Sequence, residues 1–129
     1  MARLALFIVF FWFGSLKLLG QSPASPLAET LTAKTIGQQY FEVSFALLAI
    51  VECVIGLLFL VPKLTRVVIP LLLLHMVVVC SPLVLLSDMT WQSWFVPTLE
   101  GQYIIKNAVV VALAVGIAAS TQPYQKSRK

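Results

Sequence analysis

Long apolar runs alternate with short polar segments along this chain. Four of the runs are long enough to cross a bilayer as helices, since a membrane span needs about 20 mostly apolar residues. We expect these membrane helices at about residues 4–20, 42–61, 67–87 and 103–120. The pattern therefore predicts an all-α fold, a four-helix transmembrane bundle formed as one domain over residues 1–129.

Prolines and their neighbours predict a short additional helix and a kink. In the connection after the first run, Ser25 and Pro26 are typical of a helix N-cap followed by a first-turn proline. Leu27 and Leu31 then share a face, so we expect a short interfacial helix in this external loop. Pro82 lies inside the third run, where a proline removes a backbone donor, and predicts a kink.

Composition and charge support the membrane interpretation. Of the 129 residues, 60% are hydrophobic and 11% are charged, whereas a soluble domain has about 25% charged residues. The basic residues lie at the edges of the runs, which suits lipid headgroups and gives no patch for nucleic acid. Lys63 and Arg66, and the C-terminal Lys126, Arg128 and Lys129, predict that both termini are cytoplasmic.

The first run also has a feature of a secretory signal, because Arg3 precedes its apolar core. Lys17 near its end and the bulky stretch at residues 10–13 are unfavourable for cleavage, so we expect an uncleaved helix.

Each run contains an ionisable residue: Lys17, Glu52, His75 and Lys106. Such residues are costly in a bilayer and mark a functional site by default. At about 1.5 Å of rise per residue, Glu52 and His75 lie about 14 Å and 12 Å from the cytoplasmic surface, and the two lysines about 20 Å. We therefore expect two polar layers, with Glu52 and His75 at mid-membrane and Lys17 and Lys106 in the outer leaflet.

Glu52 and His75 are the candidate catalytic residues. A tight connection joins their runs, so we expect the two side chains to touch. A carboxylate beside an imidazole can relay a proton, or it can serve only as a polar clamp between helices. Lys17 and Lys106 are long enough to reach the interface. The residue types alone leave the relay and the clamp open.

Small residues predict where helices pack closely. Ala108, Ala112, Gly116 and Ser120 form a stripe on the fourth run, about 160° from Lys106. We expect either the stripe or Lys106 to face the bundle interior. We expect this stripe to pack inside one chain, with a homo-oligomer contact through the Ala112 and Gly116 face as the alternative.

A second small face lies on the second run, at Ala46, Ala49, Cys53 and Gly56, and we expect it to pack within the chain. Cys53 and Cys80 differ by about 8 Å in estimated depth, which exceeds the Cα separation of about 7 Å that a disulfide allows. We therefore expect no disulfide between these cysteines.

Two stretches give the chain a family resemblance: Phe13-Gly14-Ser15-Leu16-Lys17, and Leu99-Glu100-Gly101-Gln102-Tyr103-Ile104-Ile105-Lys106-Asn107. With the glutamate that precedes Gly56, they make the sequence resemble the DoxX-like family of small bacterial membrane proteins, which is related to the reactive-chlorine-resistance inner-membrane family. The resemblance implies a multi-pass protein of the bacterial inner (cytoplasmic) membrane and a bias towards quinone or thiol redox. The resemblance matches Lys17, Glu52, Lys106 and Asn107 to polar positions of the family, but it assigns no role to them.

The favoured function is a subunit or accessory of a quinone- or thiol-linked redox system. A quinone needs hydrogen-bonding groups at the edge of an apolar slot. The candidate ligand-binding residues are Lys17, Lys106, Asn107, Glu52 and His75. The sequence has no metal, haem or flavin motif, so we expect no intrinsic cofactor, and a soluble or membrane redox partner must supply electrons. The alternatives are a non-catalytic assembly or stress-protection partner of another membrane complex, and a small-solute carrier.

Overall fold

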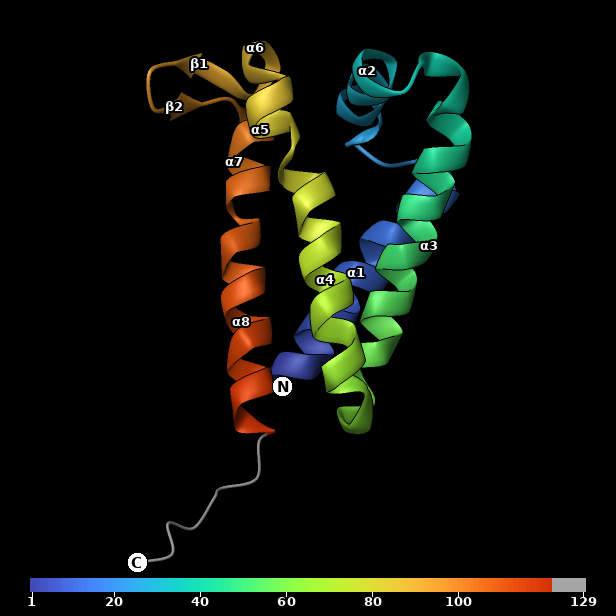
Figure 1. Ribbon diagram of the computed structural model, residues 1–129, viewed down its shortest axis with the longest axis vertical. Coiled ribbons are helices and arrows are strands. Elements are labelled where there is room, and N and C mark those ends of the chain that lie inside the picture. The colour runs from blue at the N-terminus through green and yellow to red at the C-terminus, as the bar shows by residue number, and fades with distance from the viewer. Residues whose placement is uncertain (122–129) are drawn as a thin grey trace, which may run out of the picture.

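Long helices stand side by side in this protein, and short elements gather at one end of them (Figure 1). The computed structural model describes residues 1–121, so the basic residues predicted at the C-terminus lie outside the described part. The elements in chain order are α1 (Ala2–Leu18), α2 (Ser25–Thr35), α3 (Phe41–Phe59), α4 (Thr65–Cys80), α5 (Pro82–Leu85), α6 (Ser87–Thr90), β1 (Trp91–Ser93), β2 (Val96–Pro97), α7 (Leu99–Ile105) and α8 (Asn107–Ser120).

Within residues 1–121, three helical stretches are long and apolar enough to cross a membrane. They are Gln38–Phe59, Pro62–Leu85 and Leu99–Ser120, with mean hydropathies of 2.2, 2.5 and 1.8. These stretches correspond to the second, third and fourth predicted spans. The first predicted span forms α1, an apolar helix of 17 residues that crosses aslant behind α3 and α4 (Figure 1).

The apolar core lies where α1, α3, α4 and α8 meet. Its buried side chains are Leu6, Phe10, Ile55, Phe59, Val68, Leu72, Met76, Ala114 and Ile117. Arg3 ties the start of α1 to the turn between α3 and α4, since its guanidinium donates to the Phe59 carbonyl (3.2 Å) and to Thr65 Oγ1 (2.9 Å).

Glycines set the close approach of α1 to α3. A Cβ at Gly14 would lie 2.7 Å from Cys53 Sγ and 2.9 Å from the Ala49 carbonyl oxygen, and one at Gly56 would lie 3.0 Å from the Phe11 nitrogen. Neither glycine can therefore carry a side chain without moving its neighbour. The prediction that this small face of the second span packs within the chain is confirmed.

The helix of the third span breaks at the predicted proline. The helix α4 ends at Cys80, and a new short helix, α5, begins at Pro82. The connection that follows contains a short antiparallel pairing of β1 with β2, in which Trp91 faces Pro97 and Ser93 faces Val96. The expectation of an all-α chain is wrong at this hairpin, where Phe95 takes a left-handed backbone conformation (φ 58°).

The connection between α1 and α3 forms the expected short helix, α2, which lies over the space between α3 and α5 (Figure 1). Ser25 is not its N-cap: the cap is Ala24, and the Ser25 hydroxyl donates to the Ser22 carbonyl. None of the residues of α2 is buried. Lys34 Nζ donates to the Leu85 carbonyl (2.6 Å) and so links α2 to α5.

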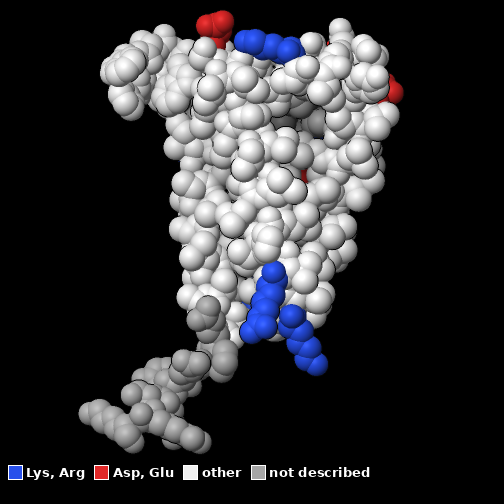
Figure 2. Space-filling view, viewed as in Figure 1, with Lys and Arg blue, Asp and Glu red and all other residues white. Residues whose placement is uncertain are grey.

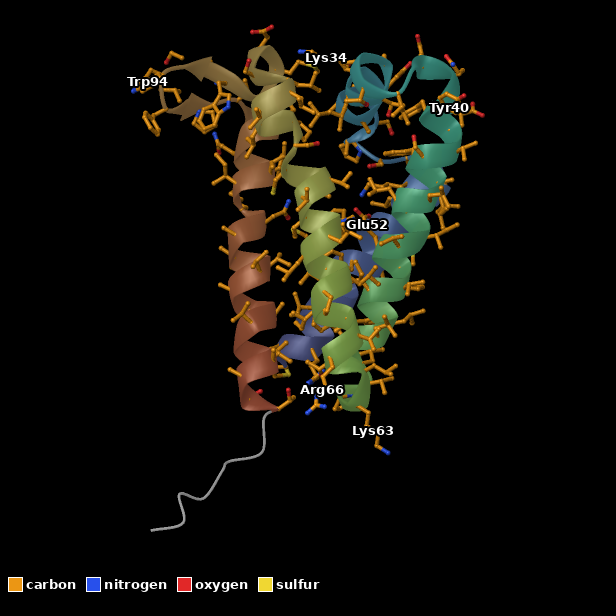
Figure 3. All side chains as sticks on the ribbon, in the orientation of Figure 1. Lys34, Tyr40, Glu52, Lys63, Arg66 and Trp94 are labelled. Carbon is orange, nitrogen blue, oxygen red and sulfur yellow. The ribbon has the colours of Figure 1, made fainter. Side chains whose placement is uncertain are left out.

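Basic side chains lie at both ends of the molecule. Lys63 and Arg66 lie at the end where α3 and α4 are joined, and Lys34 lies at the opposite end (Figure 3). The start of α1 lies near the first of these ends (Figure 1).

Candidate functional site

Three ionisable side chains from three helices meet between those helices. Lys17 of α1 donates from Nζ to Glu52 Oε2 of α3 at 2.6 Å. His75 of α4 places Nε2 3.3 Å from Glu52 Oε1. The exposed fractions of the Lys17, Glu52 and His75 side chains are 10%, 7% and 2%. We refer to these three residues as the polar cluster.

Local sequence features position each member of the polar cluster. Gly14, one turn before Lys17, lets α1 approach the turn of α3 that carries Glu52. The helix α1 ends just after Lys17, because Gly20 adopts a left-handed conformation (φ 70°) and Gln21 N–H donates to the Leu16 carbonyl. The lysine is thus held at the end of a helix that leans on α3.

His75 is held by packing on its other side. Its ring lies edge-on to Phe10, with ring centroids 6.0 Å apart and planes at 72°. Leu72, one turn earlier in α4, is fully buried in the core. The imidazole orientation is therefore set by apolar neighbours as well as by Glu52.

Charges within the polar cluster balance. The Lys17 ammonium and the Glu52 carboxylate neutralise each other, and a neutral imidazole leaves the sum at zero. A buried charge without a partner costs several kcal/mol, so the pair depends on both members. Among the described residues, His75 Nδ1 is the buried side-chain nitrogen or oxygen that has no hydrogen-bond partner.

A hollow opens towards the polar cluster. The helices α3 and α4 lie close together at their shared turn and diverge towards α2 (Figure 1). Figure 2 shows a hollow between them, below α2, and farther down the same face a small patch of an acidic residue between the surrounding side chains. Figure 3, in the same orientation, labels Glu52 at that place. Glu52, whose side chain is 7% exposed, is therefore visible from this face of the molecule.

The predicted contact between Glu52 and His75 is confirmed, but the predicted layering is wrong for Lys17. Lys17 joins Glu52 and His75 instead of forming an outer layer with Lys106. The depth estimate assumed helices along the membrane normal, whereas α1 is aslant and climbs less per residue (Figure 1). The sequence analysis missed this pairing, although opposite charges in neighbouring apolar runs were a signal from which it could have been predicted.

Lys106 and Asn107 lie outside the polar cluster, at the junction of α7 and α8. Lys106 is exposed, with Nζ 5.5 Å from the centroid of the Tyr103 ring. The small-residue stripe is exposed too, and a Cβ at Gly116 would meet nothing within 4 Å. The expectation that the stripe or Lys106 faces the interior is wrong, because α8 buries Ala114 and Ile117 instead.

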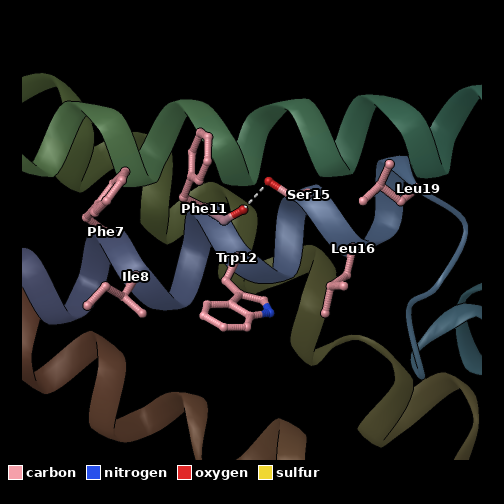
Figure 4. A pocket seen from close by; sticks show the side chains of 7 residues that line it. All are labelled: Phe7, Ile8, Phe11, Trp12, Ser15, Leu16 and Leu19. Atoms are coloured by element: carbon pink, nitrogen blue, oxygen red, sulfur yellow. Dashed lines mark hydrogen bonds between the residues drawn. The ribbon is translucent and has the colours of Figure 1, made fainter.

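A separate groove runs along α1 (Figure 4). It has a volume of about 460 Å³ and is lined by Phe7, Ile8, Phe11, Trp12, Ser15, Leu16 and Leu19. Its lone hydroxyl, on Ser15, is already bonded to the Phe11 carbonyl (2.7 Å). The groove therefore offers mainly apolar contact, with the indole N–H of Trp12 as a further donor among its lining groups.

In the part of the chain that the structure describes, no group of three or more His, Cys, Asp or Glu residues can hold a metal ion. Cys53 and Cys80 are both free thiols, as expected. Comparisons with protein-family models, curated proteins and solved structures found no match to this chain.

Proposed function

We propose that this protein is a DoxX-like subunit or accessory of a quinone- or thiol-linked redox system in the bacterial inner membrane. In this proposal the polar cluster of Lys17, Glu52 and His75 binds the ligand and exchanges a proton with it. The observation that carries the proposal is the burial of three ionisable groups from three helices at one point. Intramembrane ionisable residues are costly and are retained mainly where they serve substrates or protons.

The proposed topology is a four-helix bundle with both termini cytoplasmic. The 17 residues of α1 are about 26 Å long at 1.5 Å each, and because the helix is aslant its rise is shorter than the hydrocarbon thickness of about 30 Å, so we propose α1 as a short, tilted fourth span. Arg3, Lys63 and Arg66 belong to the end that we assign to the cytoplasm. The hollow above the polar cluster then faces the outer half of the bilayer.

The chemistry follows from the groups in the polar cluster. A lipid-soluble ligand with a polar head can place its body among apolar side chains and its head beside Glu52 and His75. The imidazole can take a proton from the head or return it, and Glu52 stabilises the protonated ring. Electrons come from a redox partner, because the sequence has no haem, flavin or metal motif.

The first prediction tests this role with His75→Gln. The glutamine amide can still face Glu52, so the fold should persist while the ring nitrogen Nδ1 is lost. We expect at least a tenfold weaker affinity for a short-chain hydroquinone, measured by calorimetry on the protein in nanodiscs under reducing conditions. Lys106→Gln, which removes an exposed lysine outside the polar cluster, is the matched control and should bind as the wild type does. Hydroquinone binding that depends on Lys106 and not on His75 would overturn the proposed site.

The second candidate function is a non-catalytic assembly partner, and the exposed stripe on α8 favours it. Small residues allow helices in a membrane to approach closely, and the space beside Gly116 is open. On this hypothesis the Ala112 and Gly116 face contacts a second copy of the chain.

Cysteine crosslinking tests this second candidate. In a variant without native cysteines, Ala112→Cys should form a disulfide-linked dimer when membranes are oxidised, because the two Cα atoms at the interface would lie within the separation that a disulfide allows. Leu74→Cys, at an exposed position of α4, is the control and should stay monomeric. Equal crosslinking at both positions, or none at either, would count against a specific α8 interface.

A further inference from the structure

The position of Glu52 fixes which nitrogen of His75 carries the proton. An ionised carboxylate accepts hydrogen bonds and cannot donate them. A lone pair on Nε2 would repel the Glu52 oxygen 3.3 Å away, so Nε2 is the protonated nitrogen of the neutral ring. The other nitrogen, Nδ1, then presents a lone pair and acts as an acceptor.

Charge balance favours this neutral form of the ring. Lys17 and Glu52 already sum to zero, so a second proton on His75 would leave a net positive charge in the bundle interior. Such a charge is costly in the membrane unless a negative partner arrives with it. The resting polar cluster therefore offers an unfilled acceptor at Nδ1, on a side chain that is 2% exposed.

We propose that the ligand of the polar cluster is an apolar molecule bearing a phenol-type hydroxyl, which donates its hydrogen to His75 Nδ1. This inference rests on the proposed function and narrows it: of the two redox forms of a quinone, the cluster selects the hydroquinone. A carbonyl oxygen is an acceptor and cannot satisfy Nδ1, which is itself an acceptor.

The same geometry gives the proton a destination. When the hydroxyl ionises, its O–H bond breaks and an N–H bond forms at Nδ1, with no electron transferred in this step. The resulting imidazolium lies against the Glu52 carboxylate, and the phenolate that forms supplies the negative charge that balances the cluster. Lys17 orients the carboxylate through its 2.6 Å contact.

The chain contains a single histidine, so its ring nitrogens need no residue assignment in ¹⁵N NMR, and their couplings to the ring C–H protons distinguish Nδ1 from Nε2. The experiment uses the full-length protein in nanodiscs with ¹⁵N-labelled histidine, and 4-hexylphenol as the probe. The matched control ligand is 4-hexylanisole, in which a methyl group replaces the hydroxyl hydrogen. We expect a protonated Nε2 and an unprotonated Nδ1 whose resonance moves with the phenol and not with the anisole, and at least tenfold tighter binding of the phenol.

A proton on Nδ1 in the resting protein, or equal binding of phenol and anisole, would overturn the inference. An Nδ1 resonance that does not move when the phenol is added would overturn the inference too. The ligand hydroxyl would then not donate to Nδ1, as expected if a trapped water already occupies that acceptor. His75→Gln should abolish the preference for the phenol while the protein stays folded. If the phenol binds as expected but quinone-linked activity does not depend on His75, the ligand inference stands and the proposed redox function fails. If the activity depends on His75 but phenol and anisole bind equally, the redox function stands and the ligand inference fails.

Discussion

Replacing Glu52 with glutamine will destabilise the protein by about 3–5 kcal/mol, the largest effect of any conservative substitution in the polar cluster. The substitution leaves the Lys17 ammonium 10% exposed and without a counter-charge, and it removes the group that faces His75 Nε2. In a thermal unfolding experiment in detergent, the midpoint should fall by at least about 10 °C.

A control and a compensating variant make this result specific. Glu42→Gln changes an exposed glutamate in the first turn of the same helix, α3, and should cost at most about 1 kcal/mol from lost helix-dipole stabilisation. Lys17→Met combined with Glu52→Gln removes both charges and should recover much of the stability, because no uncompensated charge stays buried. If Glu52→Gln alone unfolds like the wild type, the pairing with Lys17 does not stabilise the bundle.

This measurement also bears on the choice between a clamp and a relay. Loss of folding in Glu52→Gln assigns a structural role to Glu52, but it leaves the role of His75 open. His75→Gln keeps an amide beside Glu52 and removes only the second ring nitrogen. A folded His75→Gln protein that no longer binds ligand therefore supports a proton-exchanging site rather than a clamp.

Replacing Gly101 with alanine will destabilise the packing of α7 against α6 by about 3 kcal/mol or more. A Cβ at this buried position would lie 2.1 Å from the Thr90 carbonyl oxygen and 3.1 Å from Pro97 Cβ. The obstacle is backbone on one side and a proline ring on the other, so no flexible side chain can move away. Thr98 holds the same turn, since its hydroxyl donates to the Met89 carbonyl and accepts from Gly101 N–H.

The matched control is Gly116→Ala in α8. Nothing lies within 4 Å of a Cβ at that position, and replacing a mid-helix glycine with alanine stabilises a helix by about 0.5–1 kcal/mol. Unfolding midpoints in the same detergent should therefore move in opposite directions for the two variants. A shift of the same sign and size in both would contradict the tight contact at Gly101.

The sequence alone predicted the features that depend on short stretches of chain. Length and hydropathy located the spans at 42–61, 67–87 and 103–120, and Pro82 located the break between α4 and α5. The contact of Glu52 with His75 was also predictable, because a tight turn makes their helices antiparallel neighbours. The hairpin after α6 was missed, since strands of three and two residues leave no periodic signal.

Only the tertiary structure decided which polar residues share a site. Four ionisable residues in four apolar runs gave no information on helix tilt or rotation, which packing between helices sets. The slant of α1, made possible by Gly14 and Gly56, brings Lys17 to Glu52. The rotation of α8 buries Ala114 and Ile117 and leaves Lys106 outside the cluster. Hydrophobicity along the chain thus determined the helices, and the fit of their side chains in three dimensions determined the site.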